Sequence, residues 1–306
     1  MPDLGLNSEH VVVIQNGSQV DYLNFSGNTL TGSFLANYPG LTGWDIVASG
    51  FYNGDAFPDL VFQNATTGQL DFVFLNANAG MIGTLLGPIV PPVQGEGLFP
   101  GAAVGQMGPT LVSQLPDGSI DLLAVNAAGA LIRSDLIPGT AGLPGIVGVA
   151  ESSTAILSAQ FPIIQGINSG ADDSIVVQYP NGLLDVLGFT GNFAATGVVF
   201  SGSFALPGTA GSPPVFAIDQ DFNFGSSNVN HAATVNGVFG EVVSMVGQLA
   251  NGQIDSLFFD SGYFPADHGA TRGVEFATLA ENTFVPAGWH IVDAGIVAHT
   301  DLFPIT

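Results

Sequence analysis

The sequence predicts an all-β protein, a five-bladed β-propeller made of four-stranded antiparallel blades. Three observations predict it. A hairpin motif occurs five times, the composition combines 46% apolar residues with 42 Gly and 19 Pro, and a segment near the C-terminus repeats one near the N-terminus. Units of four short strands, separated by tight turns and repeated around an axis, are typical of a propeller.

The hairpin motif is an apolar run that ends in Gln, a turn that contains Gly, and a second run that opens around an Asp. Asn-Gly or Asp-Gly between two β-rich runs favours a hairpin, because a type I′ turn needs positive φ at both central residues. The five copies lie at residues 13–21, 61–71, 112–121, 172–187 and 246–255.

The runs between the turns predict the strands in order. The first group has three, at 10–16, 19–25 and 29–35, and the second has four, at 41–50, 59–63, 69–75 and 81–86. The third group is expected at 101–106, 110–114, 119–125 and 130–136. The fourth is expected near 155–165 and at 173–178, 183–189 and 194–200, and the fifth at 214–219, 242–248, 253–259 and 272–278.

The ends of the chain complete one another. Pro-Ala-Gly-Trp-His-Ile-Val-Asp-Ala-Gly at 286–295 matches Leu-Thr-Gly-Trp-Asp-Ile-Val-Ala-Ser-Gly at 41–50, the expected first strand of a blade. The N-terminal group lacks a first strand, so we expect strand 289–294 to join it and close the ring, which would remove exposed sheet edges. The sequence thus predicts one domain, 1–306, with blades at about 10–38 plus 288–297, 43–90, 100–140, 154–205 and 213–285.

The charge balance limits the partners. The chain has two cationic residues, Arg133 and Arg272, against 25 acidic ones, for a net charge of −23. Such a charge repels nucleic acid and anionic lipid. There is no Cys, no apolar stretch of transmembrane length and no visible N-terminal signal peptide. The composition is compatible with export, and we expect an extracellular or bacterial cell-surface protein.

One stretch carries a family resemblance. Residues 43–64, Gly-Trp-Asp-Ile-Val-Ala-Ser-Gly-Phe-Tyr-Asn-Gly-Asp-Ala-Phe-Pro-Asp-Leu-Val-Phe-Gln-Asn, resemble the FG-GAP/VCBS repeats of β-propellers, and 288–295 resemble their first strand. The family usually has more than five blades and includes adhesion, carbohydrate-binding and enzyme-associated modules. The resemblance implies a calcium site in the Asp/Asn-Gly-Asp loop, at Asn53, Asp55 and Asp59. The alternative is a hydrogen-bonded Asx turn without an ion.

The repeated Gln and Asp residues are the main candidates for a binding site. Counting outward from two-residue turns, or from a three-residue loop at Thr66-Thr67-Gly68, places each Gln opposite an Asp. The predicted pairs are Gln63–Asp71, Gln114–Asp121, Gln178–Asp185 and Gln248–Asp255, whereas Gln15 and Asp21 fall out of register without a bulge. Each pair either satisfies a half-buried carboxylate between blades or forms one of several equivalent ligand sites.

The long segments at 137–153, 201–213, 220–241 and 260–285 contain further candidates. Phe222, Tyr263 and His268 offer rings suited to stacking on a sugar or an apolar partner. Alternatively, these segments cover the blade edges and pack on themselves. Both interpretations remain open on the sequence.

The predicted function is a secreted or surface-exposed, non-catalytic binding module, a multivalent, lectin-like propeller that binds glycan or another surface protein in adhesion. One alternative is a self-associating structural surface or matrix protein, because a largely apolar chain with two cationic residues can pack against its own copies. A second is a hydrolase or lyase with axial carboxylates such as Asp45 and Asp293. The lack of a nucleophile–base motif, a P-loop or a dinucleotide fingerprint argues against catalysis and against an organic cofactor.

Overall fold

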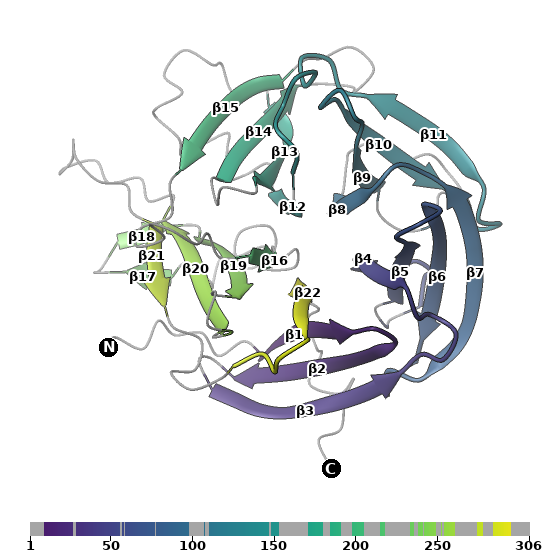
Figure 1. Cartoon of the computed structure of the whole chain (residues 1–306). Helices are drawn as coiled ribbons and strands as arrows, with labels where there is room; N and C mark the ends of the chain where they lie inside the picture. The colour runs from purple at the N-terminus through teal and green to yellow at the C-terminus, as the bar shows by residue number, and fades with distance from the viewer. Residues whose placement is uncertain are drawn as a thin grey trace.

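Antiparallel β-sheets arranged around a central axis form the protein (Figure 1). The computed structural model describes residues 9–26, 29–55, 57, 59–76, 78–97, 107, 110–146, 148–152, 171–179, 184–190, 198–204, 215–217, 233–235, 238–240, 242–248, 252, 254–260, 274–277 and 284–294. In these residues the strands form five four-stranded sheets and one two-stranded hairpin. The prediction of an all-β chain with four-stranded antiparallel sheets is confirmed.

Each sheet runs from an inner strand at the axis to an outer strand at the periphery. The first sheet consists of β22 (His290–Ala294), β1 (Glu9–Asn16), β2 (Gln19–Ser26) and β3 (Thr29–Asn37). The second consists of β4 (Trp44–Gly50), β5 (Asp59–Asn64), β6 (Gln69–Leu75) and β7 (Met81–Ile89). The third consists of β8 (Val93–Gly97), β9 (Thr110–Gln114), β10 (Ile120–Val125) and β11 (Leu131–Leu136).

The remaining sheets follow the same order. The fourth consists of β12 (Gly148–Ser152), β13 (Ala171–Gln178), β14 (Leu184–Thr190) and β15 (Val198–Phe204). The fifth consists of β16 (Val215–Ala217), β19 (Val242–Gln248), β20 (Ile254–Asp260) and β21 (Val274–Ala277). A separate hairpin joins β17 (Ala233–Val235) to β18 (Val238–Gly240).

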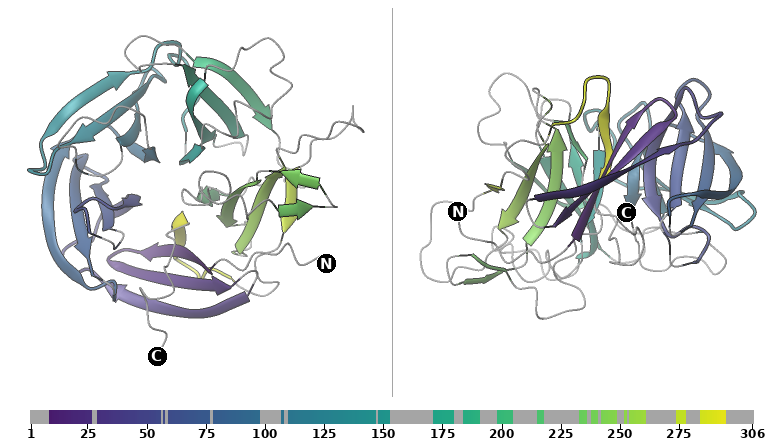
Figure 2. Two further views of the ribbon diagram at one scale, coloured as in Figure 1. Left: turned by 180° about the vertical axis from the view of Figure 1, so that it is seen from behind. Right: turned by 90° about the horizontal axis from the view of Figure 1, so that it is seen from below.

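The C-terminal strand pairs with the N-terminal strands, as the sequence predicts. β22 is antiparallel to β1, with His290 opposite Gln15 and Ala294 opposite Val12. Figure 2 shows this strand beside β1 from two further directions. The inner strands also follow one another around the axis, because β4 lies next to β22 and β8, and β12 lies next to β8 and β16. β16 in turn lies next to β22.

The core lies between neighbouring sheets. On β5, Phe62 belongs to a cluster with Val13 and Tyr22 of the first sheet, whereas Val61 belongs to a cluster with Leu111 and Leu123 of the third. Successive side chains of a strand point to opposite faces, so a strand inside the ring is buried on both faces. This explains the nearly continuous apolar runs of β5 and β10, whose residues are almost all buried.

Two inner strands lie elsewhere than expected. The sequence predicts first strands at 101–106 and near 155–165, but the inner strands of the third and fourth sheets are β8 and β12. Their glycines and small residues resemble a loop in sequence. Small residues are needed on these strands because their backbones lie close together. A Cβ on Gly95 would lie 2.6 Å from the Val149 carbonyl oxygen of the neighbouring inner strand. A further difference is the β17–β18 hairpin, which lies inside the expected long segment 220–241.

The hairpin register also differs from the prediction. Gln63 lies opposite Leu70, Gln114 opposite Ile120, Gln178 opposite Leu184 and Gln248 opposite Ile254, so each Gln faces the residue before the Asp. The predicted Gln–Asp pairs are therefore wrong. The loops are one residue longer than assumed, since Leu115 donates to the Ser119 carbonyl across a three-residue loop.

Gly118 explains that loop, because its φ of +89° supplies the left-handed residue that follows a type I turn. In the second sheet the loop has four residues, 65–68, and Gly68 N donates to the Asn64 carbonyl at 2.9 Å. Gln15 lies opposite Val20 across a two-residue turn, so the first hairpin shares the common register without a bulge in that pair of strands.

Candidate functional site

The repeated glutamines join neighbouring sheets. Gln63 Nε2 donates to the carbonyl of Gly68 in its own turn at 3.2 Å and to that of Pro91 at 3.0 Å. Its Oε1 accepts from Val93 N of the next inner strand at 2.9 Å. The side chain therefore satisfies its own turn and the beginning of the following sheet together.

Two other repeats make the same bonds. Gln15 Nε2 donates to the Gly17 and Trp44 carbonyls, and its Oε1 accepts from Ile46 N. The corresponding partners of Gln114 are Gly118 O, Pro144 O and Ile146 N. All three glutamines are buried. Gln63 and Gln114, predicted as ligand-binding residues, thus have both ends of their amides engaged by the backbone.

The repeated aspartates face the preceding sheet instead. Asp71 shares a strand face with Val73, which belongs to the core cluster of Val13 and Tyr22 in the first sheet. Asp121 shares a face with Leu123, which belongs to the cluster of the second sheet. In the same way Asp21 lies on the face of Leu23, whose cluster includes residues of the fifth sheet. The three carboxylates therefore occupy equivalent positions between sheets.

Each of these carboxylates has an unsatisfied oxygen. The Oδ1 atoms of Asp21, Asp71 and Asp121 are buried and have no hydrogen-bond partner within the described residues. Burial raises the pKa of Asp71 and also that of Asp21, where hydrogen bonds from Ser33 and the backbone of Tyr22 oppose it. An acceptor that is buried without a donor is destabilising, so these positions are unusual among polar groups.

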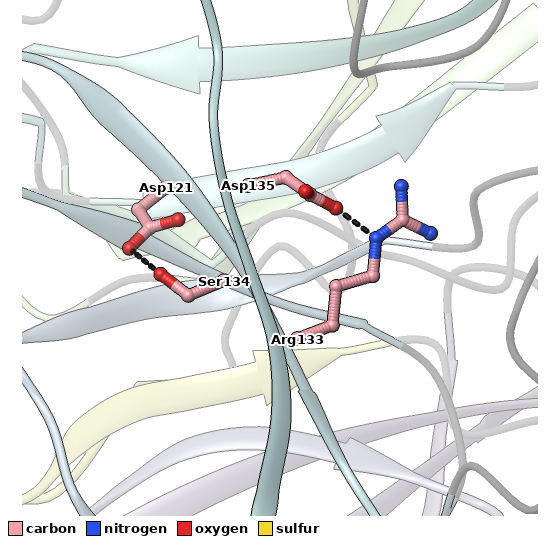
Figure 3. Close-up of polar contacts among 4 residues, drawn as sticks. All are labelled: Asp121, Arg133, Ser134 and Asp135. Atoms are coloured by element: carbon pink, nitrogen blue, oxygen red, sulfur yellow. Dashed lines mark hydrogen bonds and ion pairs between the residues drawn. The ribbon is translucent and has the colours of Figure 1, made fainter.

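Figure 3 shows the third copy in detail. Ser134 Oγ donates to Asp121 Oδ2 at 2.7 Å on one side of β11, and Arg133 Nε forms an ion pair with Asp135 on the other. Asp121 is 7% exposed, whereas Asp21 and Asp71 are half-buried and so lie partly in solvent. The same arrangement of an Asp on the third strand and a hydroxyl on the outer strand occurs with Asp21 and Ser33.

An exposed leucine lies beside each carboxylate. Leu35 is opposite Asp21, Leu86 is opposite Asp71 and Leu136 is opposite Asp121 on the outer strands. These leucines are 55%, 62% and 54% exposed. Each position therefore combines an oxygen acceptor with an accessible apolar side chain. In the fourth sheet Asp185 is opposite Ser203, so the leucine does not recur there.

The Asn53 loop is closed by its own hydrogen bonds. Asp55 N donates to Asn53 Oδ1 at 2.8 Å, and Asn53 Nδ2 donates to Asp55 Oδ2 at 2.7 Å. Asp59 is fully buried and accepts from the backbone N–H groups of Tyr52, Asn53 and Leu75. Desolvation raises the pKa of Asp59 to about 6, against the opposing effect of these bonds.

The hydrogen bonds of the loop compete with a calcium ion for its oxygens. N–H donors occupy the carboxylate oxygens of Asp59 that a cation would need. Within the described ranges, no group of three or more His, Cys, Asp and Glu side chains could hold a metal. Calcium at Asn53, Asp55 and Asp59 stays a prediction, which thermal melting in calcium and in a chelator would test.

The other predicted site residues divide into two groups. Gln178, Asp185, Gln248 and Asp255 lie on described strands at the equivalent repeat positions, but the structure does not describe their side chains. Phe222, Tyr263 and His268 lie outside the described residues. Of the two axial carboxylates, Asp45 is exposed on β4, and Asp293 lies on β22, the neighbouring inner strand.

Sequence reasoning missed the leucines and the serine hydroxyls of the outer strands. The signal is present in hindsight, because Ser-Phe-Leu at 33–35, Thr-Leu-Leu at 84–86 and Ser-Asp-Leu at 134–136 each place a hydroxyl two residues before the leucine. This pattern can be related to the Asp residues only with the observed cross-strand register, which the turn lengths expected from the sequence do not produce.

Comparison with known proteins gives no family. No protein-family model and no curated protein matches the chain. Among solved structures, the chain is similar to one described as a nidogen/laminin complex, with 8% identity, 82% of this chain and 89% of that chain covered, and a TM-score of 0.38.

No helix in the described part of the chain is long and apolar enough to cross a membrane.

Two further structures have similar scores. The periplasmic gluconolactonase PpgL of Pseudomonas aeruginosa has 11% identity, covering 88% of this chain and 82% of that chain, with a TM-score of 0.38. SapL1 lectin in complex with alpha methyl fucoside has 14% identity, covering 90% of this chain and 85% of that chain, with a TM-score of 0.38. Similarity at this level assigns neither a ligand nor an activity to the chain.

Proposed function

We propose that the protein is a non-catalytic, multivalent binding module for a neutral, hydroxyl-rich ligand such as a glycan. The observation that carries the proposal is the buried carboxylate oxygen without a donor at the same place in three repeats. A ligand hydroxyl is a donor of the right size for such an acceptor. The repeat makes the binding multivalent, so weak single sites would add up to high avidity.

The apolar neighbour supports a sugar over an ion. A pyranose ring has an apolar face and hydroxyl groups at its edge, and each position offers an exposed leucine beside the carboxylate. A calcium ion would need several more oxygen ligands, and within the described residues no group of three or more His, Cys, Asp and Glu side chains could hold a metal. The proposed sites are those of Asp21, Asp71 and Asp121, and Asp185 and Asp255 extend the series if their side chains have the same partners.

The proposal includes a closed five-bladed propeller. The succession of neighbouring inner strands around the axis and the pairing of β22 with β1 support it. A secreted or cell-surface location suits the net charge of −23 and the absence of cysteine. Membership of the FG-GAP/VCBS repeats is part of the same proposal and rests on residues 43–64 and 288–295.

A glycan array on the purified protein tests the proposal. We expect saturable binding to a defined class of glycan, in calcium and in chelator alike, that is lost when Asp21, Asp71 and Asp121 are together replaced by Asn. The replacement removes the anionic acceptor and keeps the side-chain size. Failure of the folded wild type to bind any glycan, or equal binding by the triple variant, would overturn it.

One observation supports the alternative function, that of a self-associating structural surface or matrix protein. Large apolar side chains are exposed on the outer strands β3, β7 and β11, and the two longer strands, β3 and β7, contain no charged residue. Exposed, uncharged edge strands favour pairing with another chain. An enzymatic role has no such support in the described residues.

A further inference from the structure

The outer strand β11 differs from the other outer strands in its charges. Its sequence, Leu-Ile-Arg-Ser-Asp-Leu, contains Arg133, one of two cationic residues in a chain with 25 acidic ones. Arg133 is ion-paired with Asp135 on the same strand (Figure 3). The strand as a whole is therefore neutral, although the chain carries a net charge of −23.

β11 also has a free edge. It is the last strand of its sheet, and within the described residues it pairs with β10 alone. Leu131, Ile132 and Leu136 are 40%, 44% and 54% exposed. Free backbone N–H and C=O groups flanked by apolar side chains are a template for a further strand. Lysine, a common protection of such edges, is absent from the chain.

The sequence of β11 is complementary to itself when it is read antiparallel. About Ser134 as the centre, Arg133 lies opposite Asp135 of a second copy, and Ile132 lies opposite Leu136. A two-fold axis produces each of these contacts twice. Opposite charges and apolar pairs that face each other across antiparallel strands are stabilising, and like charges are destabilising.

We propose that β11 is a self-association edge on which a second copy of this chain docks its own β11, antiparallel and centred on Ser134. The ion pair within each strand is exchanged for two ion pairs between the copies. This inference does not depend on glycan binding, because the occupant is a second copy of the chain, although the edge includes Leu136, which also borders the proposed ligand position at Asp121. Six-residue strands form a small interface, so the dimer is weak and concentration-dependent.

The net charge of −23 on each copy opposes association at low salt. At about 0.15 M salt the Debye length falls to about 8 Å, so repulsion between distant charges is largely screened. Sedimentation equilibrium at this ionic strength, over a range of protein concentration, should therefore reveal the dimer. We expect a dissociation constant in the micromolar to sub-millimolar range.

Charge exchange tests the register. Arg133→Asp alone and Asp135→Arg alone each place like charges opposite one another, and we expect each variant to dimerise at least about tenfold more weakly. The double variant Arg133→Asp/Asp135→Arg restores both pairs and should dimerise like the wild type. A mixture of the two single variants should form heterodimers, because each strand then faces the opposite charge.

The control for net charge is the double variant Gln19→Glu/Thr66→Glu, which adds two negative charges at exposed positions of other sheets. It should dimerise nearly as the wild type does. The inference is overturned if the wild type stays monomeric at the highest soluble concentration, or if the single variants dimerise as well as or better than the wild type. The latter result would show that Arg133 protects the edge against association.

A covalent trap gives an independent readout. The chain has no cysteine, so Ser134→Cys introduces a single thiol at the proposed two-fold axis. Mild oxidation should yield a disulfide-linked dimer, because residues opposite each other across strands bring their Cβ atoms close enough for a disulfide. Thr66→Cys, at an exposed position of the loop between β5 and β6, is the control and should stay mostly monomeric. Equal cross-linking of both variants would contradict the assignment to β11.

Discussion

A single amide side chain joins neighbouring sheets in each of the three repeats where that side chain is described. Gln15, Gln63 and Gln114 use both ends of the amide, and each contacts the glycine carbonyl of its own turn. The sequence predicted that these positions matter but not what they bind. The Gln recurs because each repeat presents the same backbone groups to it, so its role is to hold neighbouring sheets together.

The first prediction replaces Gln63 by Glu, which has the same shape. A buried carboxylate would then face the carbonyls of Gly68, Val90 and Pro91, which in the wild type accept hydrogen bonds from the Gln63 amide. We expect the free energy of unfolding at pH 7 to fall by about 3 kcal/mol. Chemical denaturation measures it, and Gln19→Glu on the exposed surface should change it by less than about 0.5 kcal/mol.

The raised pKa of Asp59 makes the stability of the folded protein depend on pH. Its pKa is about 6 in the folded protein, against 3.8 for the ordinary group, so between these values the folded state holds a proton that the unfolded state releases. The free energy of unfolding should therefore rise as the pH falls from about 7 to 4. The gap between the two pKa values corresponds to about 3 kcal/mol.

Acidification also reduces the net negative charge, so the Asp59 contribution needs a control. Asp59→Asn cannot titrate, and its amide would point N–H groups at backbone N–H donors. The variant should be less stable than the wild type and should gain less stability on acidification. Equal pH dependence of the two melting curves would show that Asp59 is not the responsible group.

At the level of elements, the middle and outer strands could be predicted from sequence better than the inner ones. β5 and β10 are buried on both faces and therefore have continuous apolar sequences. β8 and β12 lie at the axis, where neighbouring backbones approach closely and small residues are needed. A glycine chosen for close approach and a glycine in a loop look the same in sequence.

The close approach at the axis gives an element-scale prediction. In Gly95→Ala, the new Cβ would lie 2.6 Å from the Val149 carbonyl oxygen and force β8 and β12 apart. The matched control is Gly142→Ala, which also has a positive φ but has no atom within 4 Å of its new Cβ. Thermal denaturation should show that Gly95→Ala loses at least about 2 kcal/mol more than the control. Similar losses would refute this packing.

The sequence correctly predicts the hairpins, but it does not predict their cross-strand register. Asp117-Gly118 suggested a two-residue turn, whereas Pro116 and Gly118 suit a type I turn followed by a left-handed residue. One extra loop residue moves every cross-strand partner by one position. The candidate Asp residues were therefore found, while their partners on the outer strands were missed.

At the scale of the whole molecule, the seam between the chain ends decides whether the sheets form one ring. Trp44 N donates to Leu41 O and Trp289 N donates to Pro286 O, so the repeated segments at 41–50 and 286–295 enter their strands by the same turn. Ile46 and Ile291 occupy equivalent positions, and both are 5% exposed.

These two isoleucines provide a test of ring closure. If β22 is as firmly held as β4, Ile291→Ala and Ile46→Ala should each lower the free energy of unfolding by about 2–4 kcal/mol. Chemical denaturation of both variants measures this. A loss below about 0.5 kcal/mol for Ile291→Ala alone would mean that the seam opens without unfolding the rest.

Binding and stability should oppose each other in this molecule. The carboxylates of Asp21 and Asp71 weaken the folded state, because burial raises the pKa of each and so disfavours its ionised form. Buried polar groups without a partner are uncommon in folded proteins, and a ligand hydroxyl would supply the missing donor. Glycan binding at repeated positions and weak dimers at β11 would together create a multivalent surface.

The most direct test measures stability and glycan binding on the same variant, Asp71→Asn. Removing a carboxylate whose pKa burial raises should increase the melting temperature at pH 7, and replacing the anionic acceptor by a neutral amide should weaken binding on the array. A higher melting temperature together with weaker binding is the result that this account predicts. A variant that binds as well as the wild type, or that loses stability, would contradict it.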